Sequence, residues 1–155
     1  MTTAKILFCT DFSENSIPAR HRAVEYAEAF SAELCILHVV NASPLGYPIF
    51  EERIPVDMAQ LQQDIQERVQ EELDLVAQEC REAHFSDDFD VSASYRVADP
   101  AEGIVQFADE ENVDLIVMGT HGWTGFKSLI LGSTAENVVR TANCPVLTVR
   151  SKTPD

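Results

Sequence analysis

The sequence predicts an α/β fold: an open sheet of five parallel strands in the order 3-2-1-4-5, with helices on both faces. Three observations lead to this prediction. Short apolar runs alternate with longer amphipathic segments, as in sheets whose parallel strands are joined by helical crossovers. Four of the runs are compact and almost wholly apolar, which is typical of strands buried on both faces. The remaining run alternates polar and apolar residues, which is typical of a half-exposed edge strand.

The order of the strands follows from which two lie at the edges. The alternating run is VSASYRV, at 91–97, and it is the third along the chain. The fifth run begins at Pro145, which cannot donate a ladder hydrogen bond and therefore also suits an edge. The expected strands are Lys5–Cys9, Leu34–Val40, Val91–Val97, Leu115–Gly119 and Pro145–Val149.

Amphipathic segments between these runs predict the helices. Residues Asn15–Phe30 form the first, with Phe30 among its apolar positions, and Val56–Ala83 form a long second helix with a strongly acidic outer face. The phrase DPAEG begins a third helix, with Asp99 as its N-cap and proline in the first turn. Asn143 is expected to end the last helix before the final strand.

Composition and charge exclude several classes of function. The 155 residues suit one domain, and 45% of them are hydrophobic. The net charge of −15 argues against nucleic acid and anionic membranes as partners, but local donors could still hold a small phosphate compound. With no signal peptide and no bilayer-length apolar stretch, we expect a cytoplasmic protein. The four cysteines show no metal-ligand spacing and are expected to be reduced core residues: Cys9, Cys35, Cys80 and Cys144.

A glycine-rich stretch follows the fourth strand. Sheets of this order bind ligands beyond the carboxyl ends of the strands where the order reverses, here between strands one and four. Gly119 and Gly122 lie at that point, where glycine lets backbone approach a ligand closely. Gly132 and Ser133 open the next helix, whose free N–H groups attract anions. The stretch therefore predicts a phosphate site, with Ser133 donating its hydroxyl.

Other interpretations of this stretch stay open or fit poorly. Ser133 and Glu136 also match an S-x-x-E capping box, in which case the serine only caps its helix. Residues Gly122–Ser128 lack the spacing of a P-loop. A helix N-terminus contributes about 0.3–2 kcal/mol to binding a charge, whereas micromolar affinity needs about 8 kcal/mol. Further backbone donors and burial of an apolar group such as a base must supply the rest.

The spacing Gly119-x2-Gly122-x9-Gly132-Ser133 resembles the nucleotide motif of the universal stress proteins, in their ATP-binding branch. KILFCTDFSENS is similar to that family's first strand and turn, and LCILHVV to its second strand. ENVDLIVMGTHG and ENVVRTANCPVLTVR are similar to its fourth strand and to its closing helix and strand. The resemblance covers nearly the whole chain. One departure is Cys9, where the family often has proline.

The resemblance implies a flavodoxin-like sheet that binds ATP, with or without Mg²⁺. It implies homodimers formed through the last strand, Pro145–Arg150, and a protein partner that the sequence does not identify. It also implies roles by position: Thr10 and Asp11 near adenine and ribose, Val39 and Met118 around the base, Gly119, Gly122, Gly132, Ser133 and Thr134 around the phosphates, with His121 and Lys127 as further phosphate contacts.

Three functions remain at this stage. The first is an ATP-binding regulatory protein of the stress response, acting as a nucleotide-dependent switch or sensor. The second is a slow ATPase or phosphate-transferring enzyme, for which Asp11, His121 and Glu136 are the nearby candidates and form no convincing pair. The third is a nucleotide-free dimerisation module. Asp11 could also simply cap the helix near Ser13, and His121 and Lys127 could be solvated surface residues.

Overall fold

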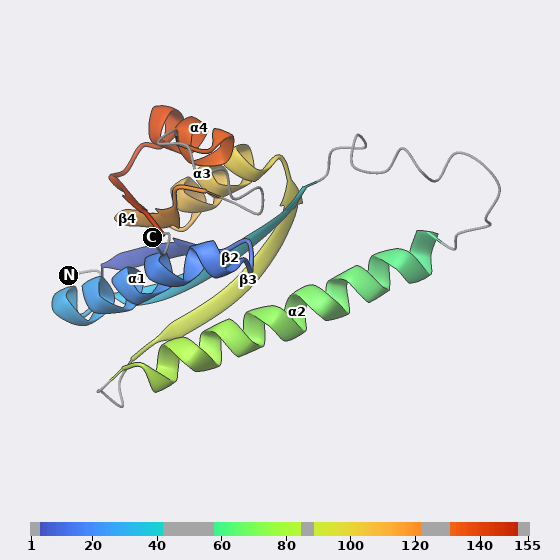
Figure 1. Ribbon diagram of the computed structural model, residues 1–155, viewed down its shortest axis with the longest axis horizontal. Helices are drawn as coiled ribbons and strands as arrows, with labels where there is room; N and C mark the ends of the chain where they lie inside the picture. Colours follow the sequence, from blue (N-terminus) through green and yellow to red (C-terminus); the bar gives the residue numbers. More distant parts are fainter. Residues whose placement is uncertain (1–3, 42–57, 85–88, 122–130, 152–155) are drawn as a thin grey trace.

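Helices cover both faces of a five-stranded sheet in the computed structural model (Figure 1), which describes residues 4–41, 58–84, 89–121 and 131–151. The strands run in the order β3-β2-β1-β4-β5 and each pairs in parallel with its neighbours, which confirms the predicted order. They are β1 Lys5–Cys9, β2 Glu33–Asn41, β3 Val91–Ala98, β4 Leu115–Gly119 and β5 Val146–Val149.

The helices connect successive strands. A 3₁₀ turn, η1, at Glu14–Ser16 leads into α1, and α3 begins as predicted: Asp99 is its N-cap and accepts a hydrogen bond from the backbone of Glu102 at 3.2 Å. Asn112, just beyond α3, has a φ of 54°, the left-handed conformation that turns the chain into β4. The helices are α1 Ile17–Phe30, α2 Met58–Glu82, α3 Pro100–Glu110 and α4 Ser133–Thr141.

Alternate residues of each strand enter separate cores on the two faces of the sheet. In β1, Ile6 and Phe8 pack with α1 and α2, whereas Leu7 and Cys9 pack with α3 and α4. Figure 1 shows the same two layers, with α3 and α4 on one side of the sheet and α1 and α2 on the other. The contact face of α1 consists largely of small residues that let it lie close to the strands: Ala19, Ala23 and Ala27.

Two expectations about helix ends are wrong. Phe30 is 62% exposed, because it is the last residue of α1 and the chain turns through Ser31 (φ 49°) so that Ala32 takes the buried position instead. Asn143 does not end α4, which stops at Thr141 and continues into extended backbone. The Asn143 side chain instead donates to the carboxylate of Asp109 at 3.1 Å, linking the end of α4 to α3.

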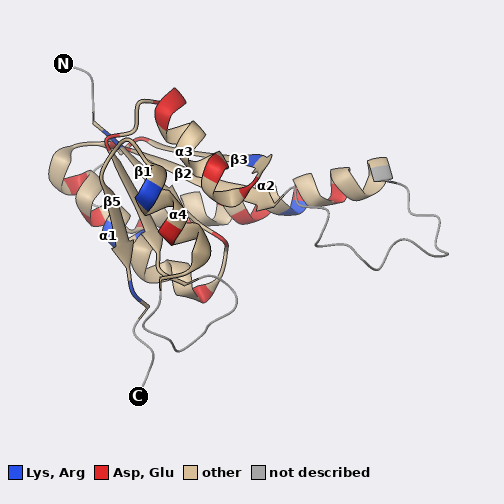
Figure 2. Cartoon of the chain, turned by 90° about the horizontal axis from the view of Figure 1, so that it is seen from above, with Lys and Arg blue, Asp and Glu red and all other residues tan. Residues whose placement is uncertain are grey.

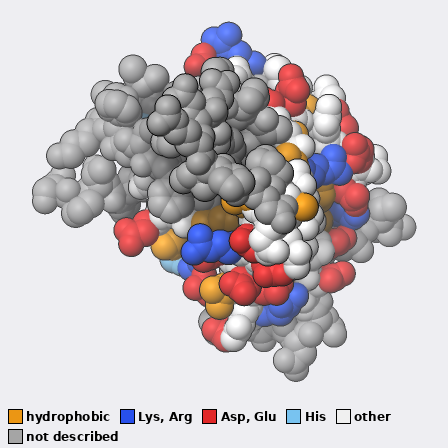
Figure 3. Space-filling model, turned by 90° about the vertical axis from the view of Figure 1, so that its right-hand side faces the viewer, with side chains coloured by type: hydrophobic (Ala, Val, Ile, Leu, Met, Phe, Trp, Pro, Cys, Tyr) orange, Lys and Arg blue, Asp and Glu red, His pale blue; other side chains and the backbone are white. Residues whose placement is uncertain are grey.

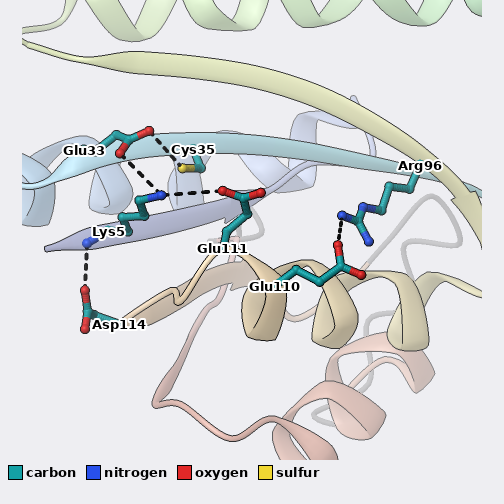
Figure 4. Close-up of polar contacts among 7 residues, drawn as sticks. All are labelled: Lys5, Glu33, Cys35, Arg96, Glu110, Glu111 and Asp114. Atoms are coloured by element: carbon teal, nitrogen blue, oxygen red, sulfur yellow. Dashed lines mark hydrogen bonds and ion pairs between the residues drawn. The ribbon is translucent and has the colours of Figure 1, made fainter.

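Polar contacts tie together the amino ends of the central strands (Figure 4). The Lys5 ammonium lies 3.8 Å from Glu33 and 3.5 Å from Glu111, and its pKa is raised, chiefly by Glu33. The backbone N–H of Lys5 donates to Asp114 at 2.8 Å. These contacts join β1, β2 and the α3–β4 connection at the end of the sheet opposite to the carboxyl ends of its strands.

A second link holds the edge strand β3 against α3 (Figure 4). Arg96 pairs with Glu110, and its guanidinium lies 5.0 Å from the ring centre of Phe107. A hydrogen bond from Arg96 holds the pKa of Glu110 below its usual value. Acidic positions are spread over several helices, with fewer basic ones between them (Figure 2). Within the described ranges no helix combines the length and the apolar character needed to cross a membrane.

Candidate functional site

A cleft of about 460 Å³ opens at the carboxyl ends of β1 and β4, where the strand order reverses. This volume falls within the roughly 300–1,000 Å³ of small-molecule pockets. Gly122 and Lys127, both predicted site residues, lie outside the described residues. All other predicted site residues line the cleft: Thr10, Asp11, Val39, Met118, Gly119, His121, Gly132, Ser133 and Thr134.

One wall of the cleft is the turn after β1, which a chain of hydrogen bonds holds in place. The backbone N–H of Phe12 donates to Thr10 Oγ1 at 3.0 Å, and Ser16 Oγ donates to the carbonyl of Ser13 at 2.7 Å. Since the Ser16 proton is used in that bond, the Thr10 hydroxyl is the donor in its 3.3 Å contact with Ser16 Oγ. Phe12 has a φ of 65°, an unusual conformation for a bulky residue that this network holds in place.

Asp11 lies on this turn with a fixed carboxylate. Its Oδ1 accepts from the backbone N–H of Ser13 at 2.9 Å and from the Ser13 hydroxyl at 2.5 Å. The N-cap of η1 is Ser13, so Asp11 supports the start of the helical segment from two residues away, as an Asx turn does. The local structural role and a place in the cleft are therefore compatible, because Asp11 also lines the cavity.

His38 is a lining residue that sequence reasoning missed. Its Nδ1 lies 2.8 Å from the carbonyl oxygen of Thr10, and since a carbonyl can only accept, Nδ1 carries the proton. The ring also packs against Phe12, with centroids 4.3 Å apart. Within the apolar run of β2 the histidine reads as an interior strand residue. His38 lies near the carboxyl end of β2, beside the carboxyl end of β1, and that position could have identified it as a residue of the cleft.

The opposite wall is the amino end of α4. The N–H of Gly132 donates to the Thr120 carbonyl at 2.7 Å, and a Cβ on Gly132 would lie 2.9 Å from that same oxygen. A Cβ on Gly119 would lie 3.2 Å from the carbonyl oxygen of Asn15. At both positions the missing side chain lets two backbone segments pack closely, so these glycines shape the cleft by shaping the fold around it.

The capping-box interpretation of Ser133 is wrong. Gly132 occupies the N-cap position and Ser133 is the first residue of α4. The other half of the expected box, Glu136, instead pairs with Arg140 at 2.7 Å, one turn further along the helix. A glycine cap satisfies no donor of the first turn through a side chain, and Gly132, Ser133 and Thr134 all line the cleft.

The cleft has an apolar half as well as a polar half. Val39 from β2, Met118 from β4 and Ile104 from α3 line the apolar part. Val39 is held against α3 by Gly103, where a Cβ would lie only 2.9 Å from Val39 Cγ1. Figure 3 shows one face of the molecule, with hydrophobic side chains near its middle and both acidic and basic side chains around them.

Three side chains that could take part in chemistry lie at or near the cleft: Cys9, His121 and Glu136. Cys9 is 8% exposed, and burial raises the pKa of its thiol, so it stays protonated at neutral pH. His121 Nδ1 lies 2.9 Å from Thr120 Oγ1, and Glu136 is directed to Arg140. Among the described residues no group of three or more His, Cys, Asp or Glu side chains is arranged to hold a metal ion.

Fold and cleft together define an α/β protein with a cleft at the switch point of a parallel sheet, which is where sheets of this order bind ligands. The family model for the universal stress protein family matches residues 2–150. Universal stress protein MJ0531 of Methanocaldococcus jannaschii is 35% identical over 147 residues, which is 94% of this chain and 81% of the relative. The chain therefore belongs to the universal stress protein family.

Solved structures share the fold. That of MJ0577 from Methanocaldococcus jannaschii superposes with a TM-score of 0.76 at 31% identity, covering 99% of this chain and 100% of that chain. The universal stress protein from Archaeoglobus fulgidus, solved in complex with dAMP, has a TM-score of 0.68 at 22% identity, over 97% of this chain and 100% of that chain. At that identity the second likeness concerns the fold alone.

Proposed function

We propose that this protein is an ATP-binding regulator of the stress response, which changes its affinity for a partner when the nucleotide is bound. The observation that carries the proposal is the two-part cleft at the switch point. Its apolar half between Val39 and Met118 suits a base, and its polar half at the amino end of α4 suits phosphates. Asp11, which also lines the cleft, would accept from ribose hydroxyls.

Estimates of binding free energy favour a ligand that has both a phosphate and a base. Phosphate at the α4 terminus alone gains about 0.3–2 kcal/mol from the helix dipole, far below the about 8 kcal/mol of a micromolar complex. Burying a base against Val39, Met118 and Ile104 adds the apolar contribution that inorganic phosphate lacks.

The family supports an adenine nucleotide. The Archaeoglobus fulgidus relative holds dAMP in a structure of this fold. The switch-point residues of the present chain resemble the motif of the ATP-binding branch of the family, which supports ATP as the ligand, and the role of each site residue, Gly122 and Lys127 included, stays a prediction. We further propose that the protein forms a homodimer through β5, an edge strand that pairs with β4 on its inner side. Sedimentation of the purified protein tests this pairing.

Two measurements test nucleotide binding. Mass spectrometry of protein purified without added nucleotide should detect co-purified ATP, and calorimetry should show saturable binding of ATP but not of inorganic phosphate at the same concentration. Thr134→Ala, in the first turn of α4, should weaken ATP binding by about 10- to 150-fold, because a hydrogen bond to a charged group is worth about 1.5–3 kcal/mol and each 1.4 kcal/mol is about tenfold in affinity.

Thr141→Ala is the matched control. Thr141 stands at the other end of the same helix, and its hydroxyl donates to the carbonyl of Asn137 at 2.7 Å, away from the cleft. It should leave ATP affinity unchanged. An empty pocket after purification, together with no calorimetric signal for ATP, would overturn the proposed function and favour a nucleotide-free dimerisation module.

A further inference from the structure

A second, smaller cavity lies on the α1–α2 side of the sheet, between the start of α1 and the middle of α2. Its volume of about 190 Å³ is below the roughly 300–1,000 Å³ of small-molecule pockets, so it suits one large side chain of a partner better than a nucleotide. We call it the anchor groove. The lining residues that matter below are Phe12, Ile17, Glu14, Glu72, Leu75 and Val76.

The lining of the anchor groove is part apolar and part polar, with Arg20 among the polar residues, and its rim includes an exposed leucine. Phe12, Ile17 and Val76 are partly buried around it. Leu75 is 56% exposed, and among the described side chains of α2 it is the large hydrophobic one left in solvent. Isolated exposed leucines are common and need no explanation. One that borders a cavity on an otherwise polar helix surface marks a place where a partner would bury apolar area.

Charge around the groove is strongly acidic. Arg20 pairs with Glu79 and so offsets one carboxylate. Glu14 and Glu72 form no ion pair with any described Lys or Arg. The whole of α2 carries seven carboxylates and two arginines. A field of this sign attracts and orients a basic partner and repels an acidic one.

We propose that the anchor groove docks a basic, amphipathic segment of a protein partner. One large apolar side chain of that segment enters between α1 and α2 beside Leu75, and its neighbouring lysines or arginines face Glu14 and Glu72. The apolar side chain supplies most of the affinity, as anchors in pockets do, and the charges supply selectivity and rate of association.

The groove and the nucleotide cleft share a wall. Thr10 and Ser16 line both cavities, and the hydrogen bonds of the Thr10–Ser16 turn join their hydroxyls to Phe12 and Ser13. A nucleotide that contacts Thr10 and Asp11 holds the turn in the conformation that shapes the groove. Nucleotide binding should therefore strengthen docking, and docking should strengthen nucleotide binding by the same factor. This coupling, unlike the docking itself, rests on the proposed function.

A display library of random peptides, selected on the immobilised full-length protein, tests the docking. The enriched peptides should share one large apolar residue flanked by Lys or Arg. Against an enriched peptide, Glu72→Lys should weaken binding about fivefold or more, since charge reversal at an interface removes an attraction and adds a repulsion. Glu71→Lys is the matched control, because it is an exposed neighbour on α2 that does not line the groove, and it should change binding less than twofold.

The outcomes separate the two proposals. Failure to enrich basic peptides, or equal losses in the two variants, would overturn the docking. Titrating the enriched peptide with and without saturating ATP then measures the coupling, for which we expect about fivefold tighter binding with ATP. Unchanged peptide affinity despite ATP binding measured by calorimetry would overturn the coupling and leave the proposed function standing. Absence of ATP binding would overturn the proposed function and the coupling, and leave the docking standing.

Discussion

Single residues determine the shape of the cleft through close contacts that few other residue types could make at the same positions. Phe12 takes a left-handed conformation that costs a bulky residue about 1–3 kcal/mol. Its bond to Thr10 and its packing against His38 offset that cost. The same contacts fix the Thr10 carbonyl, to which His38 donates at 2.8 Å. The local strain thus coincides with the turn that forms one wall of the proposed nucleotide site.

Gly103 offers a test of how finely one position sets the cleft. Replacing a helix-interior glycine with alanine ordinarily stabilises a helix by about 1 kcal/mol. Here the added Cβ would meet Val39 Cγ1 at 2.9 Å, and overpacking of this kind costs about 1–3 kcal/mol. We expect Gly103→Ala to lower the free energy of unfolding by about 1 kcal/mol, measured by urea denaturation, and to weaken ATP binding by displacing Val39 from the cleft wall.

The double variant is the control for this explanation. Val39→Ala removes the methyl groups that the new Cβ would strike, so Gly103→Ala should become stabilising when it is made in that background. If the two substitutions had additive effects on the free energy of unfolding, the contact between Gly103 and Val39 would not be the cause.

The residues of the candidate site divide by the kind of signal they leave in the sequence. Gly119, Gly132 and the Thr10–Asp11 pair could be predicted, because turns and helix starts at strand ends have a local composition that stands out. His38 could not, because its importance comes from a tertiary contact with the Thr10 carbonyl. The N-cap of α4 is Gly132 and not the predicted Ser133, and the Gly132 N–H donates to the carbonyl of Thr120, a tertiary contact that the local pattern does not contain.

At the scale of the elements, periodicity predicted the framework and failed at its ends. Strand order depended on two edges, one alternating and one beginning with proline, and both edges are where the pattern placed them. Phe30 followed the apolar period of α1, but a helix ends where its backbone turns away, and the next buried position passed to Ala32. A local pattern of apolar residues predicts which face of a helix or strand is buried. It does not predict the residue at which that helix or strand ends.

The long helix α2 contains a matched pair of leucines that tests this distinction. Leu73 is fully buried against the sheet, whereas Leu75, two residues later, is 56% exposed. We expect Leu73→Ala to lower the free energy of unfolding by about 2–5 kcal/mol, because it removes buried methyl groups and leaves a cavity. Leu75→Ala should change it by less than about 0.5 kcal/mol. Urea denaturation of both variants measures the difference.

A large loss of stability in Leu75→Ala would show that this side chain belongs to the core in solution. It would also remove the apolar rim on which docking at the anchor groove depends. A small loss of free energy of unfolding in Leu75→Ala, together with a weaker affinity for the selected peptides, would show that Leu75 contacts a partner, whereas Leu73 stabilises the fold.

At the scale of the whole molecule, charge opposes the fold. The chain carries 26 acidic and 11 basic residues, and the ion pairs of lysine and arginine among the described residues engage six carboxylates. Exposed pairs are worth about 0–1 kcal/mol each, so they do not offset repulsion among the remaining acids. Such an excess of one sign keeps a protein soluble, repels acidic partners and destabilises the compact state.

Salt should therefore stabilise this protein at neutral pH. Raising the ionic strength from 0.01 to 0.15 M shortens the Debye length from about 30 to about 8 Å and screens repulsion more than it weakens the few surface pairs. A gain of about 1 kcal/mol would raise the melting temperature by about 2–4 °C for a chain of this size. Calorimetry in NaCl at neutral pH measures it, and the same titration near the isoelectric point of about 4.5 is the control, because the net charge and the salt effect should both vanish there. A melting temperature that falls with added salt at neutral pH would mean that the paired charges, rather than the unpaired acids, dominate the electrostatic free energy of the folded state.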